Sequence, residues 1–190
     1  AVSFPRRRAD ALARLITFVA HFEKGLFAAT GSKNRENGSW AKGGKHYGDG
    51  QRTNKSKAKA YEQAATNDRY HALNLTHLGR GYDRIEFRLF SGSTNAAKIV
   101  AWIRLVLAIV EFALNTTRCV SFDSRSQDGR WGGEGECSLV GMLCKLGWLE
   151  WKAWGYRGTT YGALESSVLP RMSESVKTLR AMAKKYDAMA

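Results

Sequence analysis

The chain has 190 residues, of which 44% are hydrophobic and only two are proline, so it is long and apolar enough to fold around its own core and is not a disordered protein. Thirty Lys and Arg residues oppose 17 Asp and Glu residues, which leaves a net charge of +13. Such an excess favours a polyanionic partner, whether a nucleic acid, a nucleotide or an acidic substrate, and specifies none of them.

Residues 11–27 carry apolar side chains at helical spacing, and Asp10 stands where a helix cap is expected. We predict one helix here that covers a sheet and ends at Gly25 or Gly31. The basic run 6–8 before it leads into an amphipathic helix and not into the apolar core of a secretion signal. This feature predicts a cytoplasmic protein.

Residues 42–59 are rich in Gly, Asn, Lys and Arg and have few apolar side chains. Such a composition buries too little apolar surface to order itself, so we predict a flexible basic loop. Three roles stay open for it: closing over a nucleotide, contacting nucleic acid, or lying in solvent. A loose likeness to a phosphate-binding loop over residues 38–46 ends in His and follows no apolar strand, so we attach no function to it.

Two strands are predicted on either side of a link, residues 76–83, that contains two glycines. The first spans residues 70–75. The second starts at Arg84 and alternates apolar Ile85, Phe87 and Leu89 with charged residues, the period-2 pattern of a half-buried strand. The link allows the strands to pair as an antiparallel hairpin, which would put Asn74 on the same face as Glu86 and Arg88.

Glu86 and Arg88 are two residues apart on this strand, about 6.6 Å at roughly 3.3 Å per residue. That separation suits a carboxylate that holds a divalent cation beside a guanidinium that holds the phosphate neutralised by the cation. The alternative is a solvated polar face with a weak ion pair. The pattern alone leaves both interpretations open.

A long helix should begin near Ala96, because the residues before it, 91–95, offer a turn and several good N-cap side chains. Its first N–H groups could receive an anion at the end of the strand. Arg104 and Glu111 lie on one stripe, and nearly all other residues to Leu114 are apolar, so we expect a helix buried on most of its circumference. Charged residues interrupt the run too soon for a membrane span.

The sequence from Arg69 to Leu75, the Ile-Glu-Phe-Arg-Leu-Phe-Ser-Gly-Ser run that begins at Ile85, and the long helix with Trp102 together resemble the amidoligases. These ATP-dependent carboxylate–amine ligases are related to glutamine synthetase and glutamate–cysteine ligase. The resemblance implies a curved antiparallel sheet that binds ATP and magnesium, and an acyl phosphate that an amine attacks. It also implies that Glu86 faces the metal, Arg88 binds phosphate and Asn74 is their polar neighbour.

The family pattern has further elements that this chain matches less well. A Ser-Arg element of the family is replaced by Ser32-Lys33, so Lys33 and Arg35 are candidate phosphate contacts, although lysine lacks the two-pronged geometry of arginine. An early Gly-x-Glu-x-Glu strand that supplies metal ligands has no counterpart before Leu26. We therefore expect one of three cases: the chain is the C-terminal part of a longer ligase, a partner chain completes its site, or it keeps the scaffold without the activity.

The C-terminal half offers smaller elements. A short strand is predicted at residues 116–120, a surface loop at 123–136, and a helix over 138–146 that Gly147 closes. The aromatic residues between Trp148 and Tyr161 are either packed in a core or available to stack on bases. Residues 171–190 are predicted as a terminal amphipathic helix. The three cysteines show no Cys-x-x-Cys spacing, which favours reduced thiols and no structural metal.

Taken together, the sequence predicts an α+β protein, residues 1–190 as a single domain, with an antiparallel sheet of the glutamine synthetase-like ligase type packed against helices. The leading interpretation is an ATP- and magnesium-dependent ligase that joins a carboxylate substrate to an amine substrate. The alternative is a noncatalytic basic module that binds nucleic acid or belongs to an assembly. The positive net charge and the aromatic residues favour this alternative.

Overall fold

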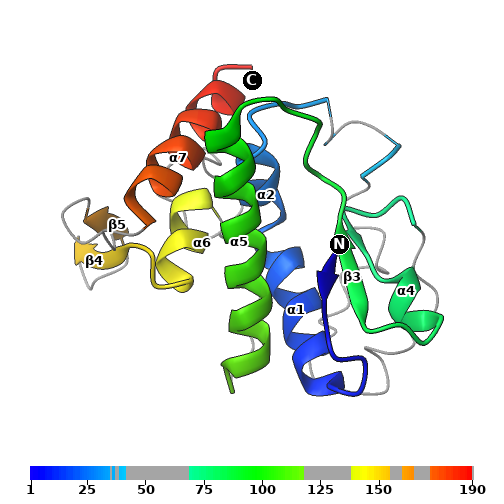
Figure 1. The fold of residues 1–190 in the computed structure, drawn as a ribbon. Helices are drawn as coiled ribbons and strands as arrows, with labels where there is room; N and C mark the ends of the chain where they lie inside the picture. The colour runs from blue at the N-terminus through cyan, green and yellow to red at the C-terminus, as the bar shows by residue number, and fades with distance from the viewer. Residues whose placement is uncertain are drawn as a thin grey trace. The chain divides into compact units, whose positions relative to one another are not determined.

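The computed structural model describes residues 1–34, 36, 39–41, 69–117, 138–154, 160–164 and 172–189, and for 150–154 and 160–164 it describes the backbone alone. The described elements are helices together with a three-stranded antiparallel sheet and a separate two-stranded one (Figure 1). The predicted α+β class is confirmed. The described residues fall into two compact units: residues 1–23, 34–91 and 106–117 in the first, and 24–33, 92–105 and those after 138 in the second.

The first unit contains the sheet, in the strand order β1-β3-β2. Its strands are β1 (Val2–Ser3), β2 (Leu73–Asn74) and β3 (Arg84–Phe87), of which β2 and β3 are shorter than predicted. The antiparallel pairing of β2 with β3 is confirmed. The link between them holds a short helix, α4 (Thr76–Gly79), and β1 pairs with the other edge of β3. Neither β1 nor α4 was predicted.

The predicted first helix is divided in two, α1 (Ala9–His21) and α2 (Glu23–Ala28). Nearly all of α1 is buried, including Arg14 and Thr17. Asp10 is not its cap. Arg8 occupies the N-cap position, and the Asp10 carboxylate lies in the first turn, where it accepts hydrogen bonds from Arg8 and Arg14.

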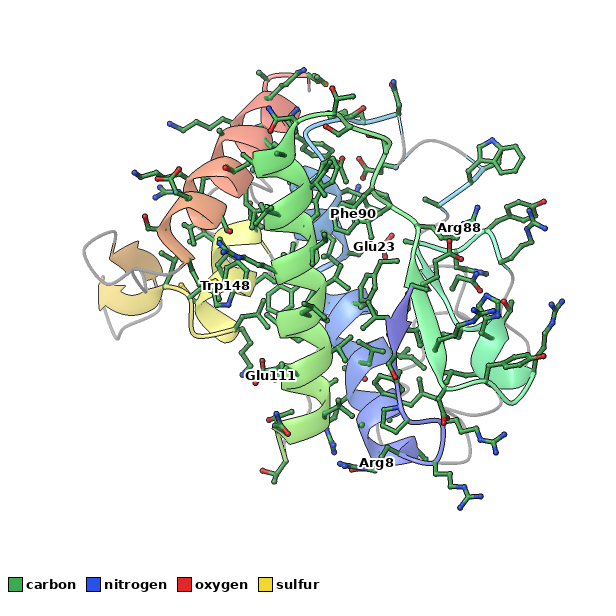
Figure 2. All side chains as sticks on the ribbon, in the orientation of Figure 1. Arg8, Glu23, Arg88, Phe90, Glu111 and Trp148 are labelled. Carbon is green, nitrogen blue, oxygen red and sulfur yellow. The ribbon has the colours of Figure 1, made fainter. Side chains whose placement is uncertain are left out.

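These two arginines also bind the last carbonyl groups of the long helix α5 (Ala96–Asn115). Arg14 Nε donates to the Ala113 carbonyl at 2.8 Å, and Arg8 Nη2 donates to the Leu114 carbonyl at 3.2 Å. Figure 2 shows Arg8 near the start of α1. The last carbonyls of a helix lack partners within the helix and carry partial negative charge, so the two guanidinium groups satisfy and stabilise this end of α5.

The long helix starts where the sequence predicted it, and Asn95 is its cap, because the Asn95 Oδ1 accepts the Lys98 N–H at 3.1 Å. The expectation that most of its circumference is buried was wrong. A stripe of four apolar side chains is exposed, namely Ile99, Val100, Ile103 and Leu107. The buried side chains follow a stripe of their own, Ala101, Trp102, Leu105, Ile109 and Ala113 among them. Among the described residues, no helix combines the length and the apolar composition that a membrane span requires.

The second unit contains α2, α6 (Leu139–Lys145) and α7 (Ser173–Asp187). The predicted helix α6 is confirmed, and Ser138 is its N-cap, since the Ser138 hydroxyl accepts the Gly141 N–H at 3.1 Å. Gly147 follows the helix with a φ of +72°, a conformation that favours glycine. The buried residues of α7 include Val176, Leu179, Met182 and Tyr186, in keeping with an amphipathic helix.

A close contact between α2 and α6 depends on Gly25. A Cβ atom at this position would lie 2.8 Å from the Leu139 backbone nitrogen, so only glycine lets the two backbones approach this closely. The Trp102 indole supports the same unit, because its Nε1 donates to the buried Ala29 carbonyl at 2.9 Å.

Two strands that were not predicted, β4 (Glu150–Trp154) and β5 (Thr160–Leu164), pair in antiparallel register from Glu150 opposite Leu164 to Trp154 opposite Thr160.

Several predictions fall on residues outside the described part of the chain. These are the basic loop 42–59, most of the strand 116–120, the loop 123–136, and the thiols of Cys119 and Cys137. Cys144 is a buried thiol, and burial raises its pKa to about 11. The assignment of residues 1–190 to a single domain stays a prediction.

Candidate functional site

The ladder between β2 and β3 brings Asn74, Glu86 and Arg88 together in the first unit. Asn74 lies directly opposite Glu86 in the antiparallel register, and the Arg88 backbone N–H donates to the Ala72 carbonyl at 2.7 Å. Directly opposed residues of an antiparallel pair project from the same face of the sheet. Figure 2 shows the Arg88 side chain beside β3.

Hydrogen bonds join the three side chains through one carboxylate oxygen. Asn74 Nδ2 donates to Glu86 Oε2 at 2.9 Å, and Arg88 Nη1 donates to the same oxygen at 3.4 Å. Asn74 is nearly fully buried, whereas the side chains of Glu86 and Arg88 are 33% and 25% exposed. The buried Asn74 amide therefore holds the Glu86 carboxylate, and both the carboxylate and the Arg88 guanidinium remain partly exposed.

The orientation of the Asn74 amide follows from its second set of partners. Asn74 Oδ1 accepts the Thr76 backbone N–H at 3.0 Å and the Thr76 hydroxyl at 2.8 Å. A backbone N–H can only donate, so the amide oxygen must face Thr76 and the amide NH₂ must face Glu86. Thr76 thus determines which hydrogen bond Asn74 offers to the carboxylate. The sequence signal for this role is the Asn-x-Thr spacing typical of an Asx turn.

The site keeps hydrogen-bonding capacity that the described residues do not use. No described residue donates to Glu86 Oε1, and the buried Arg88 Nε has no hydrogen-bond partner within the described part of the chain. The contact of 3.4 Å between Arg88 and Glu86 is long for a charge-assisted hydrogen bond, so it binds the guanidinium only weakly. One carboxylate oxygen can therefore ligate a cation and the guanidinium can bind an anion.

A magnesium ion fits this donor set only in combination with a ligand that brings oxygens of its own. Across the described residues, no group of three or more His, Cys, Asp or Glu side chains could hold a metal. Strand β1, next to β3, presents Val2 and Ser3 and no carboxylate. Magnesium is commonly held by one or two carboxylates together with substrate phosphates and water, a mode for which Glu86 suffices.

Lys33 and Arg35 are the other two predicted phosphate contacts. Lys33 belongs to the second unit, where its Nζ lies 5.3 Å from the centre of the Tyr186 ring. Arg35 lies outside the described residues. Roles for Lys33 and Arg35 in phosphate binding remain predictions.

Sequence reasoning missed a second group of side chains in the first unit. The ring centres of Trp40 and Tyr70 are 5.2 Å apart at an interplanar angle of 73°, and the Arg69 guanidinium lies 5.0 Å from the centre of the Tyr70 ring. We call these three residues the Trp40 platform. No local pattern links Trp40 to residues so much later in the sequence, and only the fold reveals the contact.

The comparison with protein families agrees with the resemblance noted in the sequence. The model of the family described as "Putative amidoligase enzyme" matches residues 8–110, more than half of the chain, and this region includes Asn74, Glu86 and Arg88. The expectation that the chain is the C-terminal part of a ligase is not borne out, since the match covers its first half. Comparison with curated proteins found no match, and comparison with solved structures found none either. By the extent of the family match, the chain belongs to the family of putative amidoligase enzymes.

Proposed function

We propose that this protein is an ATP- and magnesium-dependent ligase that joins a carboxylate to an amine through an acyl phosphate, on a sheet of the glutamine synthetase-like type. The observation that carries the proposal is the cluster of Asn74, Glu86 and Arg88 on one face of β2 and β3, within the region that matches the family. Its unused donor and acceptor suit a phosphate beside a cation.

Each residue of the cluster has a distinct role in this proposal. Arg88 binds the phosphate that is transferred and neutralises part of its charge, as fixed cations do in other phosphoryl-transfer sites. Glu86 offers its Oε1 to magnesium. Asn74, which Thr76 orients, is a positioning residue, because its hydrogen bond to Oε2 holds the carboxylate in place. Magnesium, when bound, would neutralise phosphate charge and orient the phosphates.

The reaction proceeds in two displacements. A carboxylate oxygen of the substrate attacks the γ-phosphorus of ATP, the bond to the β-phosphate oxygen breaks, and ADP leaves. The amine nitrogen then attacks the carbonyl carbon of the acyl phosphate, inorganic phosphate leaves, and the nitrogen loses a proton to give the amide. In this proposal Arg88, which follows β3 and lies 3.4 Å from Glu86, stabilises the negative charge in the first displacement.

Magnesium-dependent ATP binding tests the proposal directly. In Arg88→Ala the site loses a charge-assisted contact to phosphate, which is worth about 1.5–3 kcal/mol and predicts an affinity roughly tenfold to a hundredfold weaker. Glu86→Gln should weaken the magnesium dependence most. Arg84→Ala is the matched control, because it removes one positive charge from the exposed start of the same strand. Equal losses in Arg84→Ala and Arg88→Ala would refute a specific phosphate site.

A second candidate is the noncatalytic basic module that binds nucleic acid or belongs to an assembly, and the net charge of +13 supports it. Binding of an oligonucleotide would then weaken steeply as salt is added. It would also respond equally to Arg84→Ala and Arg88→Ala, and Glu86→Gln would not affect it. Measuring oligonucleotide and ATP binding on the same four proteins separates the two candidates.

A further inference from the structure

The Trp40 platform places a largely exposed indole beside a tyrosine and an arginine. Trp40 is 57% exposed, Tyr70 is half-buried, and Arg69 is exposed. The near-perpendicular contact with Tyr70 restrains the indole, more than half of whose surface stays exposed. An open aromatic face held in place next to a cation is the arrangement that stacks on a nucleobase.

The platform is tied through the backbone to the strand that carries Arg88. The Arg88 N–H donates to the Ala72 carbonyl, and Tyr70 lies two residues before Ala72. At no more than about 3.6 Å per residue along the chain and roughly 5 Å across a strand pair, the Cα atoms of Tyr70 and Arg88 lie within about 12 Å. The base and the terminal phosphate of a nucleotide are separated by a ribose and two further phosphates, a span of the same order.

We propose that the Trp40 platform binds the base of the same nucleotide whose phosphates contact Arg88, with the ring stacked on Trp40. This inference rests on the proposed function and adds a subsite to it. Arg69 contributes positive charge next to the stacked base, and Tyr70 positions the indole. The platform therefore contributes affinity for the base, while Arg88 contributes affinity for the phosphates.

Two probes with the same phosphate chain separate these contributions: ATP and inorganic tripolyphosphate, each with magnesium. Loss of base stacking in Trp40→Ala should weaken ATP binding about fivefold to a hundredfold and leave tripolyphosphate binding unchanged. Trp40→Phe keeps an aromatic face and should restore most of the affinity for ATP. Arg88→Ala should weaken binding of both probes. Because Trp40 is exposed, its replacement should leave the circular dichroism spectrum and the thermal midpoint unchanged.

The possible failures are distinct. Unchanged ATP binding in Trp40→Ala, with weaker binding in Arg88→Ala, would overturn the platform and leave the proposed function in place. Equal losses for ATP and tripolyphosphate in Trp40→Ala would also overturn it, because the indole would then act on the phosphates or on the fold. If the unaltered protein binds neither probe, the proposed function fails and the inference with it. Loss of single-stranded oligonucleotide binding alone in Trp40→Ala would assign the platform to nucleic acid instead.

Discussion

Replacing Arg14 tests how the first unit holds the C-terminal end of α5. Arg14 is buried, and Arg14→Met removes two hydrogen bonds while keeping an apolar stem of similar length. One bond, from Nε to the Ala113 carbonyl, is 2.8 Å long and buried, and the other, from Nη2 to Asp10, is 2.9 Å long and partly buried. The variant therefore leaves a buried helix carbonyl without its donor.

The expected loss of stability follows from the two bonds. A charge-assisted hydrogen bond to a buried group is worth about 1.5–3 kcal/mol. The contact with Asp10, whose side chain is 35% exposed, is screened by solvent and adds about 0–1 kcal/mol. Arg14→Met should therefore lower the free energy of unfolding by about 1.5–4 kcal/mol. Arg14→Lys should recover only part of this, because one ammonium group cannot reproduce the geometry of the guanidinium.

Urea unfolding followed by circular dichroism measures this effect through the midpoint and slope of the transition. Arg7→Met is the matched control, since Arg7 is exposed and carries the same charge as Arg14. Both variants change the net charge equally, so their difference isolates the buried contacts. A difference below about 0.5 kcal/mol between the two variants would show that the carbonyl end of α5 does not depend on Arg14, and would refute the reasoning.

Three further predictions concern stability. The hydrogen bonds from Arg8 and, to a smaller extent, from Arg14 lower the pKa of Asp10 below its ordinary value of 3.8. The ionised carboxylate therefore stabilises the folded protein above that pH, and this stabilisation is lost as the pH falls further. The loss of stability in Asp10→Asn, measured by urea unfolding, should be largest near neutral pH and should shrink below about pH 4. In Gly25→Ala the new methyl group meets the Leu139 backbone, so thermal unfolding should show a loss of about 1–3 kcal/mol. Trp102→Phe leaves the buried Ala29 carbonyl without its donor and should cost about 1–3 kcal/mol by urea unfolding.

Each of these predictions has an outcome that contradicts it. A deficit of Asp10→Asn that persists unchanged at pH 3 would mean that the carboxylate does not act through its charge. Gly92→Ala is the control for Gly25→Ala, because nothing lies within 4 Å of a Cβ added at Gly92; equal effects of both variants would show that the Leu139 backbone does not cause the loss. For Trp102, full stability of the phenylalanine variant would show that water replaces the indole as donor.

Local patterns in the sequence were sufficient for those features whose partners are close along the chain. Period-2 alternation located β3, Asn95 and Ser138 were recognisable as caps from the residues that follow them, and Gly147 marked the end of α6. The antiparallel pairing that sets Asn74 opposite Glu86 could also be predicted from the sequence, because two adjacent strands joined by a short link with glycines have few other ways to pair.

Only the tertiary structure decided the features that join distant residues. Strand β1 pairs with β3 across some eighty residues of sequence, Asp10 binds Arg8 and Arg14 and is not the N-cap of α1, and Trp40 contacts Tyr70 across a long intervening segment. Likewise, an almost uniformly apolar helix leaves one stripe exposed, since composition does not say which of its faces a neighbour will cover. Periodicity and capping depend on interactions within one turn or one strand. The contacts named above join residues far apart in the sequence, so they depend on the tertiary fold.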